Sequence, residues 1–257
     1  MGVTLGLIGG GGSILTVPIL IYLFHVDTVL ATGYSLFIVG LTSLVGSFSH
    51  VNNKNVDFRT AFIFGVPSII SVFVTRYYLM PKIPNNLLTL SGFVLTKDAA
   101  LLSLFAILMI AASYSMIKAC KNCKDEEKEV EEVRYDYIKI LFEGLIVGAV
   151  TGLVGAGGGF LIIPALVLFA KLPMKKAVGT SLVIIALKSL IGFLGDISKE
   201  NTFDWQFLGI FSAIAIVGIL VGSYLSKYVS NEKLKPSFGY FVFVMGVYIL
   251  TKEIFFH

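Results

Sequence analysis

The chain has 257 residues, of which 56% are hydrophobic and only 14% are charged, whereas about 25% of the residues in an ordinary soluble domain are charged. A water-soluble enzyme of this size needs more charge to cover its surface, and a disordered chain has far fewer apolar residues, so both classes are excluded. The formal net charge of +4 comes from Lys and Arg residues that are scattered among loops. No basic stripe results, so we expect no nucleic-acid partner. The composition predicts a polytopic membrane protein in contact with the lipid bilayer.

Eight stretches of the chain carry few or no charges and are candidates for membrane elements. They cover residues 1–24, 29–49, 60–75, 99–117, 137–170, 177–195, 205–226 and 236–251. Most of them are close to the length of about 17–25 residues that crosses a bilayer as one helix. No charged n-region of a secretory signal peptide precedes the first stretch, so we expect the transmembrane segments themselves to direct insertion.

Two of these stretches are interrupted by glycine clusters. Residues 137–170 would form a helix roughly 50 Å long at about 1.5 Å per residue, which exceeds the bilayer core. Residues 155–159 are four glycines and one alanine, and their low helix propensity predicts a break there. The first stretch has the same design, with four glycines at 9–12, so each stretch is expected to form a re-entrant hairpin. Only about eight residues precede the first cluster, so either that arm is short or the natural start lies upstream of Met1.

The two halves of the chain repeat each other. A shift of 146 residues places twelve glycine, proline, serine, alanine and leucine residues of the first half on identical residues of the second: Gly6, Gly9, Gly11, Gly12, Pro18, Leu20, Ala31, Gly33, Ser35, Leu36, Ser43 and Gly46. With one inserted residue, Asp57 then aligns with Asp204, and Tyr77 with Tyr224. The sequence therefore predicts two repeats, residues 1–117 and 137–257, joined by a charged linker at 118–136.

The positions of Lys and Arg distinguish two topologies, because these residues are enriched on the cytoplasmic side. If all eight stretches cross once, the two sides receive 10 and 9 of them. If each glycine-broken stretch returns to its own side, the counts become 14 and 5, with Lys188 inside the membrane and the linker in the cytoplasm. Each half then has three crossings, an odd number, so the halves are inverted. We predict an all-α polytopic membrane protein with two inverted-topology repeats, each a glycine-broken re-entrant helical hairpin plus three transmembrane helices, a design that transporters use.

The linker itself is expected to be a solvated segment rather than a binding element. Cys120 and Cys123 form a single CxxC pair, which is a weak signal for a metal or redox site, so two reduced thiols are expected. The three histidines are not spaced as metal ligands, and no catalytic motif is present. We therefore expect no catalytic residues, no metal and no cofactor.

The half-helices that begin after the glycine clusters form the candidate substrate site. The backbone N–H groups at such a helix start have no intrahelical acceptor, and the helix dipole adds partial positive charge, so a small anion fits there. The alternative is that the glycines only permit close helix packing. The residues concerned are Gly11, Gly12 and Ser13 in the first repeat and Gly157, Gly158 and Gly159 in the second.

Polar residues on the helix after each hairpin supply further candidates. Ser35 and Ser181 occupy equivalent repeat positions and are expected to face one central cavity, although serines in membrane helices often bond only their own backbone. An unpaired Lys188 near the middle of a span costs at least about 2.5 kcal/mol, so it needs a partner. That partner is either an anionic substrate or Glu143, the one acid inside an apolar stretch.

His50 and Asp196 occupy equivalent positions near the ends of these helices. They are candidates for proton coupling, because histidine titrates near neutral pH and burial shifts a carboxyl group toward it. The alternative is that both are ordinary interface residues. Arg76 and the other loop bases are expected to anchor helices at the lipid headgroups.

The glycine motifs carry a family resemblance. LGLIGGGGSILTVPIL (residues 5–20) and TGLVGAGGGFLIIPAL (151–166), followed by ATGYSL (31–36) and AVGTSL (177–182), resemble the sulfite exporter TauE/SafE family of membrane permeases over essentially the whole chain. The resemblance implies transport of sulfite, sulfonates, sulfoacetate or related small organic anions across the bacterial inner membrane, driven by the proton gradient. The first motif has four glycines where the family usually has three after a spacer residue.

Together these patterns predict a secondary transporter of small anions, and not an enzyme, with its site near the midplane between the two hairpins. An anion channel or passive pore on the same hairpins is the principal alternative. A receptor that signals through the linker is a weaker one, because that linker is too short to hold a signalling domain. A homodimer is left open by the sequence.

Overall fold

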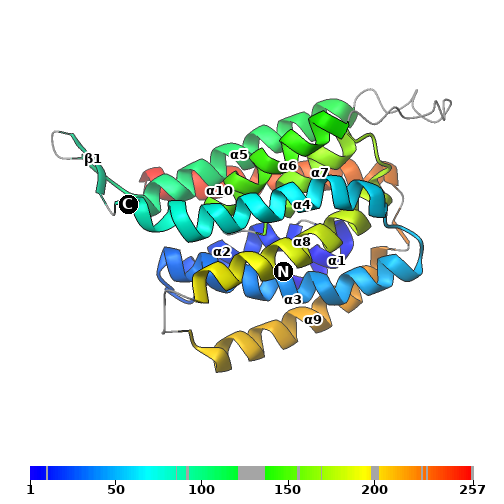
Figure 1. Cartoon of the computed structure of the whole chain (residues 1–257), viewed down its shortest axis with the longest axis horizontal. Helices are drawn as coiled ribbons and strands as arrows, with labels where there is room; N and C mark the ends of the chain where they lie inside the picture. The colour runs from blue at the N-terminus through cyan, green and yellow to red at the C-terminus, as the bar shows by residue number, and fades with distance from the viewer. Residues whose placement is uncertain are drawn as a thin grey trace.

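The computed structural model of the chain describes residues 1–9, 11–84, 86–90, 93–120, 137–154, 157–168, 170–197, 203–226, 228–229 and 231–255. Its helices form an elongated bundle in which most of them run along the long axis (Figure 1). They are α1 (Gly2–Ile8), α2 (Gly11–Tyr22), α3 (Thr28–Asn52), α4 (Phe58–Val74), α5 (Lys97–Cys120), α6 (Tyr137–Val154), α7 (Gly159–Leu168), α8 (Met174–Ile197), α9 (Trp205–Ser226) and α10 (Asn231–Phe255). A π-helical turn, η1 (Thr75–Leu79), and a 3-10 turn, η2 (Met80–Lys82), continue α4.

Two short strands add to the helical fold expected from the sequence. β1 (Asn86–Leu90) and β2 (Phe93–Thr96) form an antiparallel pair between η2 and α5. The segment joins two membrane elements and has no apolar stretch long enough to cross a bilayer, so a local pairing of its backbone is compatible with the predicted helices. Residues 121–136 of the predicted linker, with Cys123, lie outside the described residues, as do Gly10 and Gly155.

Each glycine cluster ends a helix and turns the chain back on itself. Gly9 follows α1 with a left-handed φ of +77°, which favours glycine, and a β-carbon on Gly12 would collide with Leu5, so α2 returns along α1. In the second half Gly158 has the same φ of +77°, and a β-carbon there would collide with Thr151 of α6. The breaks predicted from the glycine clusters are present in both halves.

The first arm of each hairpin packs on a helix from the other half. A β-carbon on Gly2 of α1 would strike the backbone oxygen of Ala215 on α9. At the equivalent position of α6, a β-carbon on Gly148 would strike the backbone oxygen of Ser68 on α4. Ser68 and Ala215 are themselves repeat-equivalent, so the two contacts are reciprocal. Only glycine allows helix backbones to approach this closely.

Helices α3 and α8 pass each other through the centre in opposite directions. Near the start of α3, a β-carbon on Gly33 would lie 3.3 Å from Asp196 Oδ2 at the end of α8. Near the start of α8, a β-carbon on Gly179 would lie 3.1 Å from the β-carbon of His50 at the end of α3. Because each start meets the other's end, the pair is antiparallel.

Two hydrogen bonds also connect the halves in a reciprocal way. The backbone N–H of Asp57, which caps α4, donates to Thr180 Oγ1 at 2.9 Å. The backbone N–H of the equivalent Asp204, before α9, donates to the hydroxyl of Tyr34 at 2.8 Å. Tyr34 and Thr180 are separated by the repeat shift of 146 residues. Each half therefore supplies a hydroxyl to the helix cap of the other.

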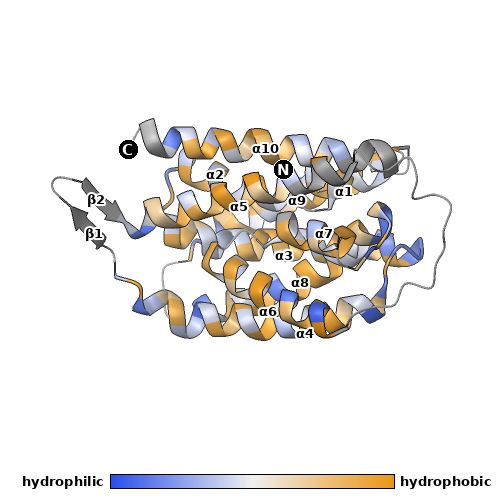
Figure 2. Ribbon diagram, turned by 90° about the horizontal axis from the view of Figure 1, so that it is seen from above, coloured by the Kyte–Doolittle hydropathy of each residue, from blue (hydrophilic) through white to orange (hydrophobic). Residues whose placement is uncertain are grey.

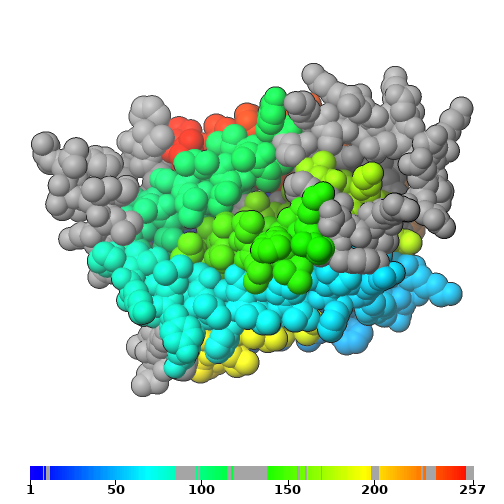
Figure 3. All heavy atoms as spheres, turned by 45° about the horizontal axis from the view of Figure 1, so that its top comes forward, coloured from blue at the N-terminus to red at the C-terminus, as the bar shows by residue number. Residues whose placement is uncertain are grey.

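The outside of the bundle is apolar. Within the described residues, four helices are long and apolar enough to cross a membrane: Thr28–Asn52, Phe58–Lys82, Met174–Ile197 and Trp205–Ser226. Figure 2 shows hydrophobic residues, in orange, along the ribbons of the helices, and α4, α5 and α6 lie side by side across the face in Figure 3. Phe62 on α4 is 71% exposed and Ile214 on α9 is 69% exposed. Large apolar side chains exposed on this scale are typical of a surface that faces lipid.

Candidate substrate site

The centre of the molecule contains a fully buried lysine. Lys188 lies in α8 with none of its surface exposed, and its Nζ donates a hydrogen bond to Thr151 Oγ1 of α6 at 2.9 Å. Glu143 precedes Thr151 by eight residues, about 12 Å along the helix axis. The structure therefore gives the ammonium group a neutral hydroxyl as its partner rather than the Glu143 carboxylate.

The second glycine turn lies directly against this ammonium group. A β-carbon on Gly158 would be 2.5 Å from Lys188 Nζ. A β-carbon on the preceding Gly157, which also has a left-handed φ of +65°, would be 3.2 Å from Ser189 Oγ. Ser189 is fully buried, and its hydroxyl has no hydrogen-bond partner among the described residues. Because these two glycines have no side chains, the backbone of the turn lies next to the Lys188 ammonium group and the Ser189 hydroxyl.

This arrangement is positively charged and rich in hydrogen-bond donors. Helix α7 begins at Gly159, and the first N–H groups of a helix have no acceptor within it. The positive end of the helix dipole adds to the charge of Lys188 beside it. An oxyanion is the ligand that such a set of donors suits best.

The first hairpin provides hydroxyl groups but no charge. Gly11 and Gly12 begin α2, and Ser13 is fully buried. Thr16 Oγ1 donates to the Gly12 backbone oxygen at 2.9 Å. Ser43, the repeat equivalent of Ser189, is fully buried and has no hydrogen-bond partner in the described part of the chain. The two hairpins therefore differ in chemistry although their sequences are repeat-equivalent. They also differ in backbone: Gly11 and Gly12 lie within α2, whereas Gly157 and Gly158 have left-handed φ values and precede α7.

Ser35 and Ser181 lie toward opposite ends of the α3–α8 pair. Ser35 lies two residues from Gly33, toward the Asp196 end of the α3–α8 pair, and Ser181 lies two residues from Gly179, toward the His50 end. The Ser35 hydroxyl is buried without a partner among the described residues. Ser181 Oγ donates to the Val178 backbone oxygen at 2.8 Å.

His50 and Asp196 lie at opposite ends of the bundle, each beside a cavity. His50 faces a cavity of about 250 Å³ that Ser223 and Lys175 also line. His50 is 6% exposed, and its Nδ1 has no hydrogen-bond partner among the described residues. Asp196 lines a cavity of about 210 Å³ at the other end, where its Oδ2 lies 3.2 Å from Arg76 Nη1.

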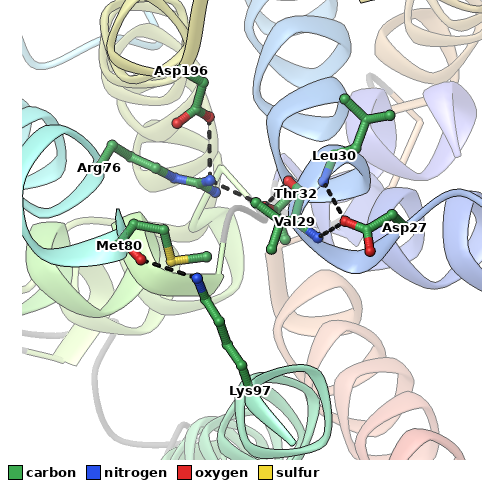
Figure 4. Close-up of polar contacts among 8 residues, drawn as sticks. All are labelled: Asp27, Val29, Leu30, Thr32, Arg76, Met80, Lys97 and Asp196. Atoms are coloured by element: carbon green, nitrogen blue, oxygen red, sulfur yellow. Dashed lines mark hydrogen bonds and ion pairs between the residues drawn. The ribbon is translucent and has the colours of Figure 1, made fainter. Parts of the chain in front are cut away.

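Sequence reasoning missed the roles of two residues in these sites, Arg76 and Thr151. Arg76, expected at the headgroups, is only 1% exposed and bonds Asp196 and Thr32 instead (Figure 4). The sequence did carry a signal that Arg76 belongs to a repeated helix rather than to a loop. Tyr77 aligns with Tyr224, so Arg76 is the repeat equivalent of Ser223. Thr151 carries no comparable signal, since a single hydroxyl in a membrane helix is unremarkable. Ser189 is the repeat equivalent of Ser43, so the duplication did point to it.

Comparison with known proteins identifies the family. A family model described as "Sulfite exporter TauE/SafE" matches residues 1–249. The chain belongs to the sulfite exporter TauE/SafE family. Membership makes it a membrane transporter of the TauE/SafE type, which confirms the resemblance found in the glycine motifs. No solved structure matches the chain.

Relatives of the TauE/SafE chain are found in bacteria and archaea. A probable membrane transporter protein of Xylella fastidiosa is 29% identical, and the alignment covers 98% of this chain and 92% of the relative. One from Methanocaldococcus jannaschii is also 29% identical, over 97% of this chain and 91% of its own length. A probable membrane transporter protein of Bacillus subtilis is 26% identical, over 97% and 93%. Each printed name describes a transporter, and the similarity extends along the whole chain.

Proposed function

We propose that this TauE/SafE protein is a secondary transporter of small anions, with sulfite, sulfonates, sulfoacetate and related organosulfur anions as its substrate class. The observation that carries the proposal is the buried ammonium group of Lys188 against the Gly157–Gly158 turn, beside the start of α7. The family description names a sulfite exporter, and the chemistry of this site suits an oxyanion.

The energetic argument concerns the unsatisfied charge of Lys188. A lysine at the centre of a membrane helix costs about 2.5–3.5 kcal/mol even on insertion scales that allow relaxation. An ammonium group has three donors, and in the described residues Thr151 is the one hydrogen-bond acceptor that it reaches. An anion at the glycine turn would supply both the missing charge and the missing acceptors. Substrate binding would then stabilise a group that is otherwise costly to bury.

Alternating access between inverted halves is the mechanism we infer. The reciprocal contacts of Gly2 with Ala215 and of Gly148 with Ser68 support a two-fold relationship of the repeats 1–117 and 137–257. The antiparallel α3–α8 pair supports opposite orientations of the two halves. Inverted repeats permit the same site to open to either side by exchange of the conformations of the two halves.

The membrane orientation follows from the positive charges. Lys54 and Lys175 lie at the His50 end of the bundle, whereas Lys82 and Lys97 lie at the Arg76 end. The hairpin topology assigns 14 Lys and Arg residues to the first end and 5 to the second. We therefore place the His50 end and the 118–136 linker in the cytoplasm. The bacterial inner membrane as the location of the chain rests on the family resemblance alone.

Coupling to the proton gradient completes the proposal. His50 is buried beside a cavity at the proposed cytoplasmic end, a suitable position for a group that exchanges protons. Asp196, its repeat equivalent, is held by Arg76. We assign proton exchange to His50 first, because the Asp196 carboxylate is already paired with the Arg76 guanidinium.

Uptake of radiolabelled sulfite into proteoliposomes tests the proposal. A carrier gives saturable uptake that a pH gradient drives and a protonophore abolishes. An anion channel, the alternative function, instead gives conductance in planar bilayers that a protonophore does not affect. Absence of sulfite, sulfoacetate and alkylsulfonate transport under all these conditions would refute the substrate class.

A further inference from the structure

The cavity at the Arg76 end has features of a binding site of its own. Its volume is about 210 Å³, and the charged residues in its lining are Arg76, Lys97 and Asp196. On this measure one water molecule needs about 10–15 Å³. The cavity is therefore large enough for a small oxyanion together with several waters.

Arg76 is the central group of this cavity (Figure 4). Its Nη1 donates to Asp196 Oδ2 at 3.2 Å and to Thr32 Oγ1 at 3.1 Å, so one guanidinium group joins η1, α8 and α3. It lies in the π-helical turn η1, and turns of this kind occur frequently at functional sites. A buried guanidinium presents several donors in one plane, a geometry that matches two oxygens of an oxyanion.

Lys97 adds a second cation from another helix. It is the first residue of α5 and only 8% exposed, and its Nζ donates to the Met80 backbone oxygen at 3.0 Å. Figure 4 shows its side chain extending from α5 toward Met80, below the Arg76 side chain. Two cations and one carboxylate give the lining a net charge of +1. Burial away from bulk water strengthens the attraction of that charge for an anion.

The described residues that line the cavity at the opposite end do not supply this combination. The repeat places Ser223 where Arg76 stands, and His50 where Asp196 stands. Ser223 and His50 line the other cavity together with a single lysine, Lys175. Among the described residues that line the two cavities, an arginine–carboxylate pair is therefore present only in the cavity at the Arg76 end.

We propose that the cavity between Arg76 and Lys97 is a second, peripheral anion site, in which a small oxyanion such as sulfite competes with the Asp196 carboxylate for the Arg76 guanidinium. The class of anion rests on the proposed function, whereas the site rests on the cavity and its charges. Asp196 belongs to α8, the helix that carries Lys188. Release of Asp196 from Arg76 would thus connect occupation of the peripheral site to the helix of the central one.

Trp205 provides a probe for this site. It is the one tryptophan of the chain, and its ring lies 6.1 Å from that of Phe203, which lines the cavity. Sodium sulfite, titrated into the purified full-length protein in detergent while tryptophan fluorescence is recorded, gives an affinity for the peripheral site. Calorimetry on the same samples counts the bound anions.

The substitutions have opposite expected effects on this affinity. Asp196→Asn removes the competing carboxylate and should tighten sulfite binding several-fold. Arg76→Gln combined with Asp196→Asn leaves no uncompensated carboxylate and should weaken binding about 10- to 100-fold, the loss expected for charge-assisted hydrogen bonds. Lys97→Gln should weaken it less. Lys175→Gln, which removes a lysine from the opposite cavity, is the matched control and should leave the affinity within about two-fold.

Two outcomes overturn the peripheral site. One is an Asp196→Asn variant that binds sulfite no more tightly than the unmodified protein. The other is an unchanged affinity in both Lys97→Gln and the Arg76→Gln/Asp196→Asn double variant. Size-exclusion profiles establish that each variant is folded, and Lys97→Gln keeps the test valid where the double variant does not fold.

Lys188→Gln separates this proposal from the proposed function. If it abolishes uptake and retains the fluorescence response, both sites stand. If it abolishes both signals, the fluorescence reports the central site and the peripheral one is refuted. If uptake persists in Lys188→Gln while the fluorescence response still depends on Arg76, the central site fails and the peripheral site stands.

Discussion

Gly158 and Lys188 are in direct contact across the break between α6 and α7: a β-carbon on the glycine would lie 2.5 Å from the lysine Nζ. The two residues are 30 positions apart in the sequence, and each limits the other. The glycine leaves space beside the ammonium group because it has no side chain, and the ammonium group places a positive charge next to the exposed backbone of the turn. The first two predictions follow from this contact.

Gly158→Ala should strongly reduce transport. Its φ of +77° is unfavourable for any residue with a β-carbon, and the new carbon would collide with Thr151 and Lys188. We expect at least a tenfold lower rate of sulfite uptake in proteoliposomes, equivalent to about 1.4 kcal/mol or more. Gly209→Ala is the matched control, because nothing lies within 4 Å of a β-carbon at that helical position. Equal uptake by the two variants would remove the glycine turn from the site.

Lys188→Ala should impair anion recognition more than Lys188→Arg does. Alanine removes the charge from the glycine turn, whereas arginine retains it. Uptake measured over a range of sulfite concentrations should show a raised KM for the arginine variant and near loss of uptake for the alanine variant. Near-normal activity in both variants would assign Lys188 a structural role through its bond to Thr151.

Thr180→Val and Tyr34→Phe should destabilise the protein to similar extents. Each removes the hydroxyl that accepts a hydrogen bond from the backbone of a helix cap, at Asp57 or at Asp204. We expect a loss of about 0.5–1.5 kcal/mol for each, measured as a lower unfolding midpoint in detergent. Thr251→Val is the control, since its hydroxyl bonds only the Val247 backbone oxygen of its own helix. A large effect in one variant alone would contradict the equivalence of the two contacts.

Cysteine labelling in intact cells should place Lys171 and Lys54 on the same side of the membrane. After Cys120 and Cys123 are replaced by serine, Lys54→Cys and Lys171→Cys should be protected from an impermeant maleimide, while Lys82→Cys is labelled. Re-entrant hairpins require this pattern, whereas eight single crossings put Lys171 on the side opposite Lys54. Labelling of Lys171→Cys together with Lys82→Cys would therefore exclude the hairpin topology.

The helix breaks could be predicted from the sequence because they depend on local backbone chemistry. Four glycines in a row at 9–12 strongly disfavour a continuous helix, and α1 does end at this run, before Gly9. The duplication was equally accessible, since it relates residues of the same type at a constant shift. The contact of Lys188 with the second break could be predicted only in part from the sequence. The cost of a charge in the membrane shows that Lys188 needs a partner, but the sequence spacing did not distinguish Glu143 from a substrate as that partner.

The inward position of Arg76 could not be predicted from the sequence around it. The residue follows an apolar stretch near a helix end, where a base ordinarily extends to the headgroups. In the structure the helix continues through η1 and turns Arg76 inward to Asp196 and Thr32. Those partners come from two other helices, so no local pattern around Arg76 could name them.

By itself, the sequence determined that this chain is a membrane protein of two similar halves, with helices that break at their glycine clusters. These properties depend on composition and on the conformational freedom of single residues. The tertiary structure alone decided that Lys188 meets Thr151 and that Arg76 is buried against Asp196. Its helices are apolar on nearly every side, so their hydropathy specifies neither rotation nor depth in the bundle, and only the packing of distant helices brings these polar groups together.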